Sequence, residues 1–280
     1  MRSGEFTATA AGGFGEGEAT GARPVACVLL ATAEPPHSST LLNAIRRRLP
    51  GFANACSNNE EGPALIGRVE GMHCMIAFCG EPGDLDPSAS YISSAWWWHD
   101  AWESLERAKA YILLSMLDAE EPSRCWQVLC RLTAAVTEAV PAIGVLWEPA
   151  DAAWPADEFR AEVDRAGEDI PVRMLVSVKV GRDECPGDDG VPTLYGLTWG
   201  LAAFNLMEIE LRCFDGEPLE MVGFLLDMAS YLIKHGDVVD DGHTVGHDGD
   251  HKKFMVRHEP STIAPGRMVH RLYLASTRLS

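Results

Sequence analysis

The stretch Thr198-Trp-Gly-Leu-Ala-Ala-Phe-Asn-Leu-Met-Glu-Ile-Glu-Leu211 decides the fold. In it a glycine-marked turn runs into a segment where apolar residues alternate with carboxylates, and the apolar residues are Met207, Ile209 and Leu211. Alternation with a period of two is typical of a half-buried strand. We therefore expect the apolar residues to face the core and Glu208 and Glu210 to lie side by side on a solvent-exposed face.

Short apolar runs and amphipathic segments alternate along the rest of the chain. Further strands are expected at 25–31, 64–69, 73–78, 111–117, 143–147, 172–180, 194–199, 241–245, 253–258 and 269–275. Helices are expected at 38–49, 96–108, 123–140, 155–165 and 219–233. The last helix has the clearest apolar stripe, which consists of Leu219, Val222, Leu226, Ala229 and Ile233.

This mixture of strands and helices predicts an α+β fold. Several strands follow one another through short links, which favours a mixed, largely antiparallel sheet or sheets with packed helices. Residues 1–23 are rich in Gly, Ala, Thr and Glu and are expected to form a flexible tail, followed by a single domain over 24–280. A division into two ferredoxin-like halves, about 24–118 and 119–280, is one arrangement that the pattern allows.

The charge of the chain restricts its partners. With 23 Lys and Arg against 41 Asp and Glu, the formal net charge is −18, which repels nucleic acid and anionic membranes and attracts basic partners. No apolar run approaches the roughly 20 residues of a membrane span. The eight cysteines form no C-x-x-C pair, so we expect reduced thiols and a cytoplasmic protein.

Two groups of polar residues are candidates for chemistry. Glu208 and Glu210 could serve acid–base catalysis or bind a hard cation, although a solvent-facing strand explains them equally well. The segment 235–258 holds five of the nine histidines together with several aspartates, a composition that suits a metal site. Its glycines also fit hairpin turns, so we expect no metal and no cofactor.

The run Trp96-Trp-Trp-His-Asp-Ala-Trp102 is the candidate contact surface. If a helix begins at Trp96, that ring shares a face with the charged residues Asp100 and Glu103, and exposed tryptophan is common at interface hot spots. Trp98 would share the other, core-facing side with Trp102 and Leu105. The alternative is that Trp96 lies in the preceding loop and packs onto the core.

Several of these residues together resemble a bacterial family catalogued as domain of unknown function 4261. The residues that carry the resemblance are Thr198, Gly200, Leu201, Phe204, Glu208 and Glu210, which match its T-x-G-L-x-x-F-G-x-x-E-I-E pattern. Asn205 stands where that pattern usually has glycine, and asparagine tolerates a left-handed backbone well.

Two further segments are similar to the same family. The segment 98–117 looks like its tryptophan-bearing helix and following strand, with Lys109 as the basic residue before the strand. The segment 219–246 looks like its terminal helix followed by a G-x-x-x-x-D-G-x-T-x-G turn, whose residues here are Gly236, Asp241, Gly242, Thr244 and Gly246. The resemblance implies an α+β domain and no agreed enzymatic activity.

No nucleophile elbow, metalloprotease motif, phosphate loop or dinucleotide fingerprint occurs in the chain. We therefore expect a non-enzymatic cytoplasmic protein-binding module, such as an immunity protein or secretion-effector adaptor in a bacterial conflict or toxin–antitoxin system, with a basic toxin or effector as partner. One alternative is a hydrolase or metal-dependent enzyme that uses Glu208, Glu210 and histidines of the 243–258 region. Another is a structural homodimer.

Overall fold

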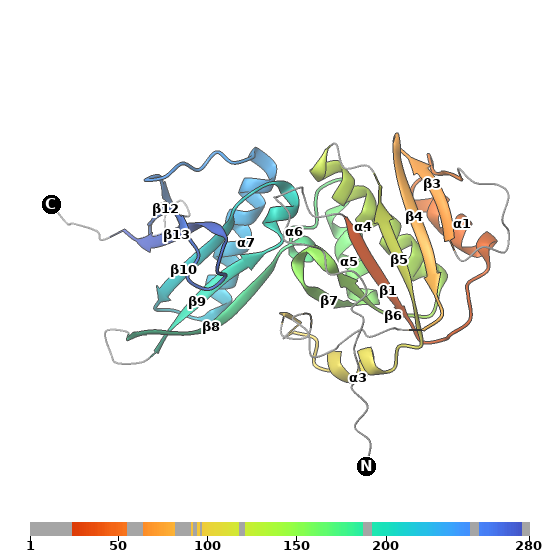
Figure 1. Cartoon of the computed structure of the whole chain (residues 1–280), viewed down its shortest axis with the longest axis horizontal. Coiled ribbons are helices and arrows are strands. Elements are labelled where there is room, and N and C mark those ends of the chain that lie inside the picture. The colour runs from red at the N-terminus through yellow and green to blue at the C-terminus, as the bar shows by residue number, and fades with distance from the viewer. Residues whose placement is uncertain are drawn as a thin grey trace, which may run out of the picture.

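The computed structural model describes residues 24–54, 64–81, 91, 94–95, 97–117, 121–186, 192–246 and 252–275, and the side chains of 185 and 186 are outside the description. The expected tail at 1–23 and the residue Trp96 both lie outside these ranges. Figure 1 shows two sheets side by side along the long axis of the molecule, each with its own helices.

The first sheet has the strand order β2-β3-β4-β5-β1-β6-β7, and its paired strands are all antiparallel. Its strands are β1 (Val25–Leu30), β2 (Ala53–Asn54), β3 (Ala64–Val69), β4 (Met72–Cys79), β5 (Ala110–Met116), β6 (Ala142–Trp147) and β7 (Ala152–Pro155). The elements that accompany it are α1 (Ser38–Arg48), α3 (Ala101–Glu106), α4 (Pro122–Ala139), the 3-10 helix η1 (Glu148–Ala150) and α5 (Ala156–Ala166).

The second sheet has the order β11-β12-β13-β10-β9-β8, and only its β10–β13 pairing is parallel among the described strands. Its strands are β8 (Ser177–Pro186), β9 (Pro192–Trp199), β10 (Glu208–Phe214), β11 (Thr244–Val245), β12 (Phe254–Pro260) and β13 (Met268–Leu274). The helices are α6 (Val172–Leu175), the 3-10 helix η2 (Leu201–Phe204) and α7 (Pro218–His235).

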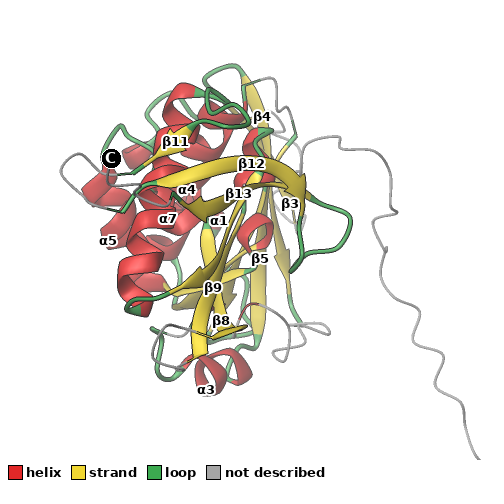
Figure 2. Ribbon diagram, turned by 90° about the vertical axis from the view of Figure 1, so that its left-hand side faces the viewer, coloured by secondary structure: helices red, strands yellow, loops and turns green. Residues whose placement is uncertain are grey.

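The longer helices α1, α4, α5 and α7 lie on one side of the two sheets, as Figure 2 shows. Alternate residues of β1 point to opposite faces of the first sheet, and both faces are buried. Ala26, Val28 and Leu30 belong to the main core with α1 and α4, whereas Cys27 and Leu29 pack with α3 in a smaller core on the opposite face. The strand is therefore apolar on both sides, which explains its unbroken apolar sequence.

The two sheets share one continuous core. Trp126 of α4 is buried and donates a hydrogen bond of 2.9 Å from Nε1 to the backbone oxygen of Ala203 in η2. Ser177 at the start of β8 donates from Oγ to the backbone oxygen of Ala150 at 2.6 Å. Both bonds tie an element of one sheet to an element of the other, so neither sheet packs as an independent layer.

The expected α+β class is confirmed, and some details differ. The division at 118/119 does not match the sheets, because β6 and β7 belong to the first sheet. The first sheet also lacks, among its described pairings, the parallel pair that a ferredoxin-like half requires. Residues 172–175 form a helix rather than the start of the expected strand at 172–180, and β8 extends beyond that range to Pro186.

The cysteines follow the expectation in part. Cys27, Cys74, Cys79, Cys125 and Cys130 are free thiols, and burial raises the pKa of Cys74 to about 11. Cys213 is disulfide-bonded, which corrects the expectation of reduced thiols at this position. No helix in the described part of the chain is long and apolar enough to cross a membrane.

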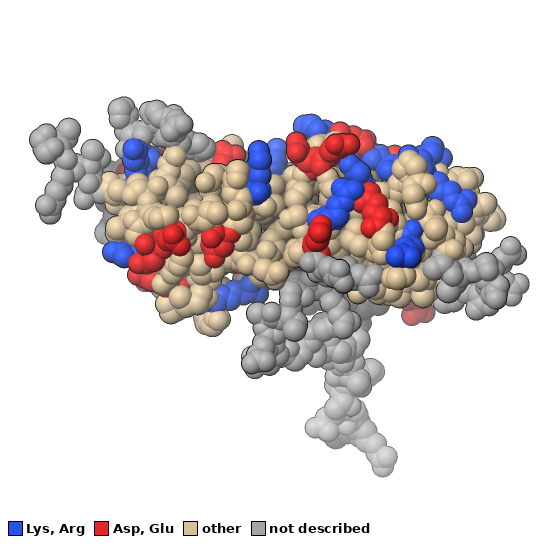
Figure 3. All heavy atoms as spheres, turned by 90° about the horizontal axis from the view of Figure 1, so that it is seen from above, with Lys and Arg blue, Asp and Glu red and all other residues tan. Residues whose placement is uncertain are grey.

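Charged side chains of both signs lie next to one another over the half of the molecule built on the first sheet (Figure 3). Arg48 of α1 illustrates this, because its guanidinium contacts both Glu138 of α4 and Asp164 of α5. The Arg46-Arg-Arg48 triplet is thus partly neutralised by acidic residues of the neighbouring helices.

Candidate functional site

Glu208 is a structural residue of the turn that precedes β10. Its side chain is 2% exposed and accepts hydrogen bonds from Thr198 Oγ1 at 2.8 Å, Gly200 N at 3.0 Å and Ala202 N at 3.2 Å. Thr198 Oγ1 in turn accepts a bond from the backbone N–H of Ile209 at 2.7 Å. Burial raises the pKa of the Glu208 carboxyl, and the donors around it oppose that rise. The expected solvent-exposed position of Glu208 is wrong.

The backbone of this turn explains its glycine and asparagine. Gly200 has φ of 127°, and a Cβ placed there would lie 2.3 Å from the backbone oxygen of Leu175. Asn205 has φ of 59°, which confirms the expected left-handed conformation at this position. The signature residues therefore build a closed turn around a buried carboxylate.

Glu210 is also buried, with 0% exposure, which again contradicts the expected solvent face. The segment that joins β12 to β13 covers it, because Thr262 donates to its carboxylate from Oγ1 at 2.7 Å and Ser261 donates from Oγ at 2.5 Å. Arg271 of β13 places Nε 3.1 Å from Glu210 Oε1. Arg267, in the segment that joins β12 to β13, stacks over Trp199 with its Cζ 3.9 Å from the ring centroid.

The strand register separates these carboxylates from the histidines. Glu210 pairs with Arg271, whereas Ile209 pairs with His270, which in turn pairs with His258 of β12. Paired residues on neighbouring strands share a face and adjacent residues point to opposite faces. Glu208 and Glu210 consequently lie on one face of the sheet, and His258 and His270 lie on the other.

Among the described residues, the two glutamates and His258 of the hydrolase or metal alternative are therefore on opposite faces of the sheet. Of the expected histidines, 247 and 251 lie outside the described residues, while His243 and His258 are described. Within the described ranges, no three His, Cys, Asp or Glu side chains are grouped so that they could hold a metal ion.

The tryptophan segment differs from its expected geometry. The helix α3 begins at Ala101, and Trp96 lies outside the described residues. Asp100 and Glu103 are both exposed. Trp102 is 42% exposed, so its expected position in the core is wrong, whereas Trp98 is half-buried and packs with the smaller core.

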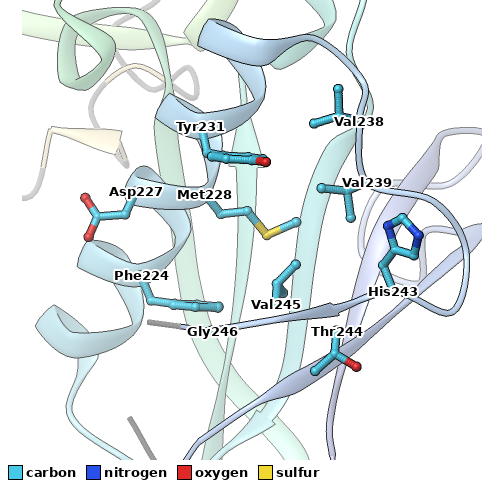
Figure 4. Close-up of a pocket in the computed structure, with 10 residues that line it drawn as sticks. All are labelled: Phe224, Asp227, Met228, Tyr231, Val238, Val239, His243, Thr244, Val245 and Gly246. Carbon is cyan, nitrogen blue, oxygen red and sulfur yellow. The ribbon is translucent and has the colours of Figure 1, made fainter. Parts of the chain in front are cut away.

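The second sheet carries a groove beside α7, which the sequence analysis did not predict. It has a volume of about 610 Å³ and lies between the C-terminal half of α7 and residues 238–246, which we call the groove wall. Figure 4 shows the side chains of Phe224, Met228 and Tyr231 extending from α7 toward Val239 and Val245 on the wall. The remaining lining residues are Asp227, Val238, His243, Thr244 and Gly246.

The rim of this groove exposes apolar surface. Tyr231 is 51% exposed and Val238 is 47% exposed, while Met228 and Val239 beneath them are buried. The groove thus combines an apolar floor and an aromatic rim with the polar side chains of Asp227, His243 and Thr244, a combination typical of ligand-binding pockets.

Hydrogen bonds from the second sheet hold the groove wall in place. Asp241 accepts a bond from the backbone N–H of His258 at 2.9 Å and pairs with Arg257 at 2.9 Å, and these donors lower its pKa. Gly242 donates to the backbone oxygen of Val256 at 2.8 Å. Gly236 and Gly242 both have positive φ, which accounts for the glycines of the turn pattern.

A pair of histidines lies beneath the same wall. The ring centroids of His258 and His270 are 4.8 Å apart, and His258 Nε2 lies 3.0 Å from the backbone oxygen of Val239. His270 is 0% exposed and its Nε2 lies 3.3 Å from Asp237 Oδ1. Burial lowers the pKa of His270, Asp237 opposes this change, and His258 adds to it.

The signal for the groove was present in α7. The expected stripe is only partly the buried face: Ala229 is fully buried and Val222, Leu226 and Ile233 pack against the core, whereas Leu219 is 67% exposed. The buried residues are Met221, Leu225, Met228, Ala229 and Leu232. A helix with apolar residues on more than one face needs more than one apolar neighbour, so the extra apolar residues of α7 indicated a second contact surface.

Comparison with known proteins gives one finding. Residues 197–273 match the model of the family described as "Domain of unknown function (DUF4261)". The matched segment contains the Glu208 turn, α7 and the groove wall. No curated protein and no solved structure matches the chain.

Proposed function

We propose that this chain, whose residues 197–273 match the DUF4261 family model, is a protein-binding module whose α7 groove receives an apolar segment of a basic partner polypeptide. The observation that carries the proposal is the open groove with its half-exposed Tyr231 and Val238. Exposed apolar patches bordered by polar residues are typical of protein contact sites. An aromatic side chain at the rim is the kind of group that dominates binding energy.

Charge supports a basic partner. The segment 215–246, which contains α7 and the groove wall, has one Lys or Arg, Lys234, against seven acidic residues: Asp215, Glu217, Glu220, Asp227, Asp237, Asp240 and Asp241. The net charge of −18 adds a long-range field of the same sign. Such a field speeds the encounter with a cationic partner, while the apolar groove would supply the short-range affinity.

The surroundings of the two glutamates argue against the enzyme alternative. The Glu208 carboxylate accepts hydrogen bonds from Thr198 and two backbone N–H groups, and that of Glu210 contacts Ser261, Thr262 and Arg271. A general base must reach the substrate proton, and buried carboxylates with several structural donors are poorly placed to do so. We propose a cytoplasmic immunity protein or effector adaptor of a bacterial conflict or secretion system as the setting.

The test is a calorimetric titration of this protein with a purified candidate partner. The candidate is the product of the gene next to its own in the native host. We expect Tyr231→Glu to weaken binding by more than tenfold, because it removes the aromatic ring from the rim and would bury a charged carboxylate against the apolar segment of the partner. The matched control is Met268→Glu, since Met268 is 49% exposed and lies on β13 at the end that pairs with Pro260, away from the groove. Salt should weaken binding to the unaltered chain.

Three outcomes would contradict the proposal. Equal affinities of the Tyr231 and Met268 variants would show that the groove is not the contact. Turnover of a small substrate in place of binding would favour an enzyme. A homodimer in sedimentation that Tyr231→Glu dissociates would show that a second copy of the chain occupies the groove, as in the structural homodimer alternative.

A further inference from the structure

We propose that His270 and His258 form a pH-sensitive contact, which we call the latch. It holds the groove wall against the second sheet at neutral pH and releases the wall on acidification. The latch itself stands on the geometry beneath the wall, and only its consequence for a partner rests on the proposed function. Both histidines lie on the face of the second sheet that the wall covers.

His270 is suited to the neutral state. It is fully buried, Nδ1 has no hydrogen-bond partner among the described residues, and Nε2 lies 3.3 Å from Asp237 Oδ1. A protonated ring carries an N–H on both nitrogens, and burying the one at Nδ1 without an acceptor is costly, so protonation favours any conformation in which the ring reaches water.

The groups around the ring determine the direction of the response. His258 faces it from β12, Asp237 faces it from the connection after α7, and its neighbour on β10 is the apolar Ile209. Asp237 would stabilise a charged His270, but that carboxylate is about half exposed and is screened by water. Burial and His258 both disfavour the charge and together outweigh Asp237.

Opening of the wall would expose the ring. Asp237 begins the connection that continues into the wall, and the contact of His258 with the backbone oxygen of Val239 fixes the wall directly above the ring pair. If His270 is solvated in the open form, that form binds a proton more readily than the closed form. The population of the open form then rises as the pH falls below about 6.5, by up to about tenfold per pH unit. The rise ends when the pH reaches the pKa of His270 in the closed form.

The test is hydrogen–deuterium exchange of the full chain at pH 7.5, 6.5 and 5.5, with rates corrected for the intrinsic pH dependence. We expect backbone amides of 238–246 to lose protection by at least fivefold between pH 7.5 and 5.5, while amides of β1 and α4 keep theirs. In His270→Leu, and in His270→Gln as a second variant that keeps a polar side chain, the pH dependence should be absent. His235→Gln, at an exposed histidine of the same region, should leave it unchanged.

Equal protection of the wall at the three pH values would overturn the latch, as would an equal loss across the whole chain. A pH response that persists in both folded His270 variants would also overturn it. Because the exchange needs no partner, failure here leaves the proposed binding function untouched, and failure of partner binding leaves the latch untouched.

Discussion

Glu208 supports the most direct test of the fold. Replacing it with alanine removes the acceptor of the Thr198 hydroxyl and the Gly200 N–H, whose hydrogen bonds are buried, and of the partly buried Ala202 N–H. A buried donor left without a partner costs about 1–3 kcal/mol. The two buried donors, Thr198 Oγ1 and Gly200 N, should therefore together lower the free energy of unfolding by about 2–6 kcal/mol, a large part of the 5–15 kcal/mol typical of a folded protein.

The assay is urea unfolding followed by circular dichroism, with the change taken from the midpoint and the slope. Glu220→Ala is the control, because Glu220 is exposed and pairs only with Lys252 at 3.2 Å among the described residues, so it should cost less than about 1 kcal/mol. Glu208→Gln should fall between the two, since its amide keeps one acceptor oxygen. A loss below about 1 kcal/mol in Glu208→Ala would refute the role assigned to this carboxylate.

The raised pKa of Glu208 adds a pH test. Its folded pKa lies above the ordinary value of 4.5 because burial disfavours the charged form. Its contribution is thus complete below pH about 4.5 and declines as the pH rises through the raised pKa. The Glu208→Gln variant should lack that decline when unfolding is measured between pH 4 and 8, and an unchanged pH profile would contradict the assignment.

Three further substitutions probe the same half of the molecule. Gly200→Ala should cost about 2–3 kcal/mol in urea unfolding, because the backbone there has φ of 127° and a Cβ would lie 2.3 Å from a backbone oxygen; a neutral effect would show that the turn can relax. Arg212 lowers the pKa of Asp183 to about 2, so that part of stability should vanish as the pH falls from about 4 to 2, and Arg212→Met should move the acid-unfolding midpoint to higher pH when followed by circular dichroism. Arg271→Met leaves the buried Glu210 without its cation and should cost about 3–5 kcal/mol, most of which the double variant with Glu210→Gln should recover in a double-mutant cycle.

Local patterns in the sequence predicted local structure well. The apolar run at 25–31 is β1, and the Glu70-Gly71 link joins β3 to β4 with positive φ at both residues. Asn205 takes the expected left-handed conformation. Each of these features depends on neighbouring residues, so the information lies within a short window.

Burial of the carboxylates depended on distant residues. The alternation placed Glu208 and Glu210 correctly on one face, opposite Ile209, but their cover comes from the turn after β9 and from Ser261 and Thr262. The chain from Glu210 to Ser261 passes through α7 and two strands before it returns. No pattern within the strand records that return, so its outer face looks like a solvent face.

The groove and the latch could not be predicted from the sequence for a similar reason. The groove needs α7 and the wall together, and the histidine pair needs the register of β12 against β13. The sequence supplied the apolar excess of α7 and the histidines, but it did not supply their neighbours. Cys213 shows the same limit, because its disulfide requires a partner that the spacing of cysteines alone did not identify.

The continuous core has a consequence for the expression of the family-matched segment 197–273 as a separate fragment. A fragment of residues 197–273 would begin within β9 and would lack β8. The remaining part of β9 would then have an unpaired edge. The fragment would also lack Trp126, whose indole N–H donates a hydrogen bond to the backbone oxygen of Ala203. Bare edges invite self-association, so such a fragment should aggregate, and the smallest autonomous unit should include both sheets.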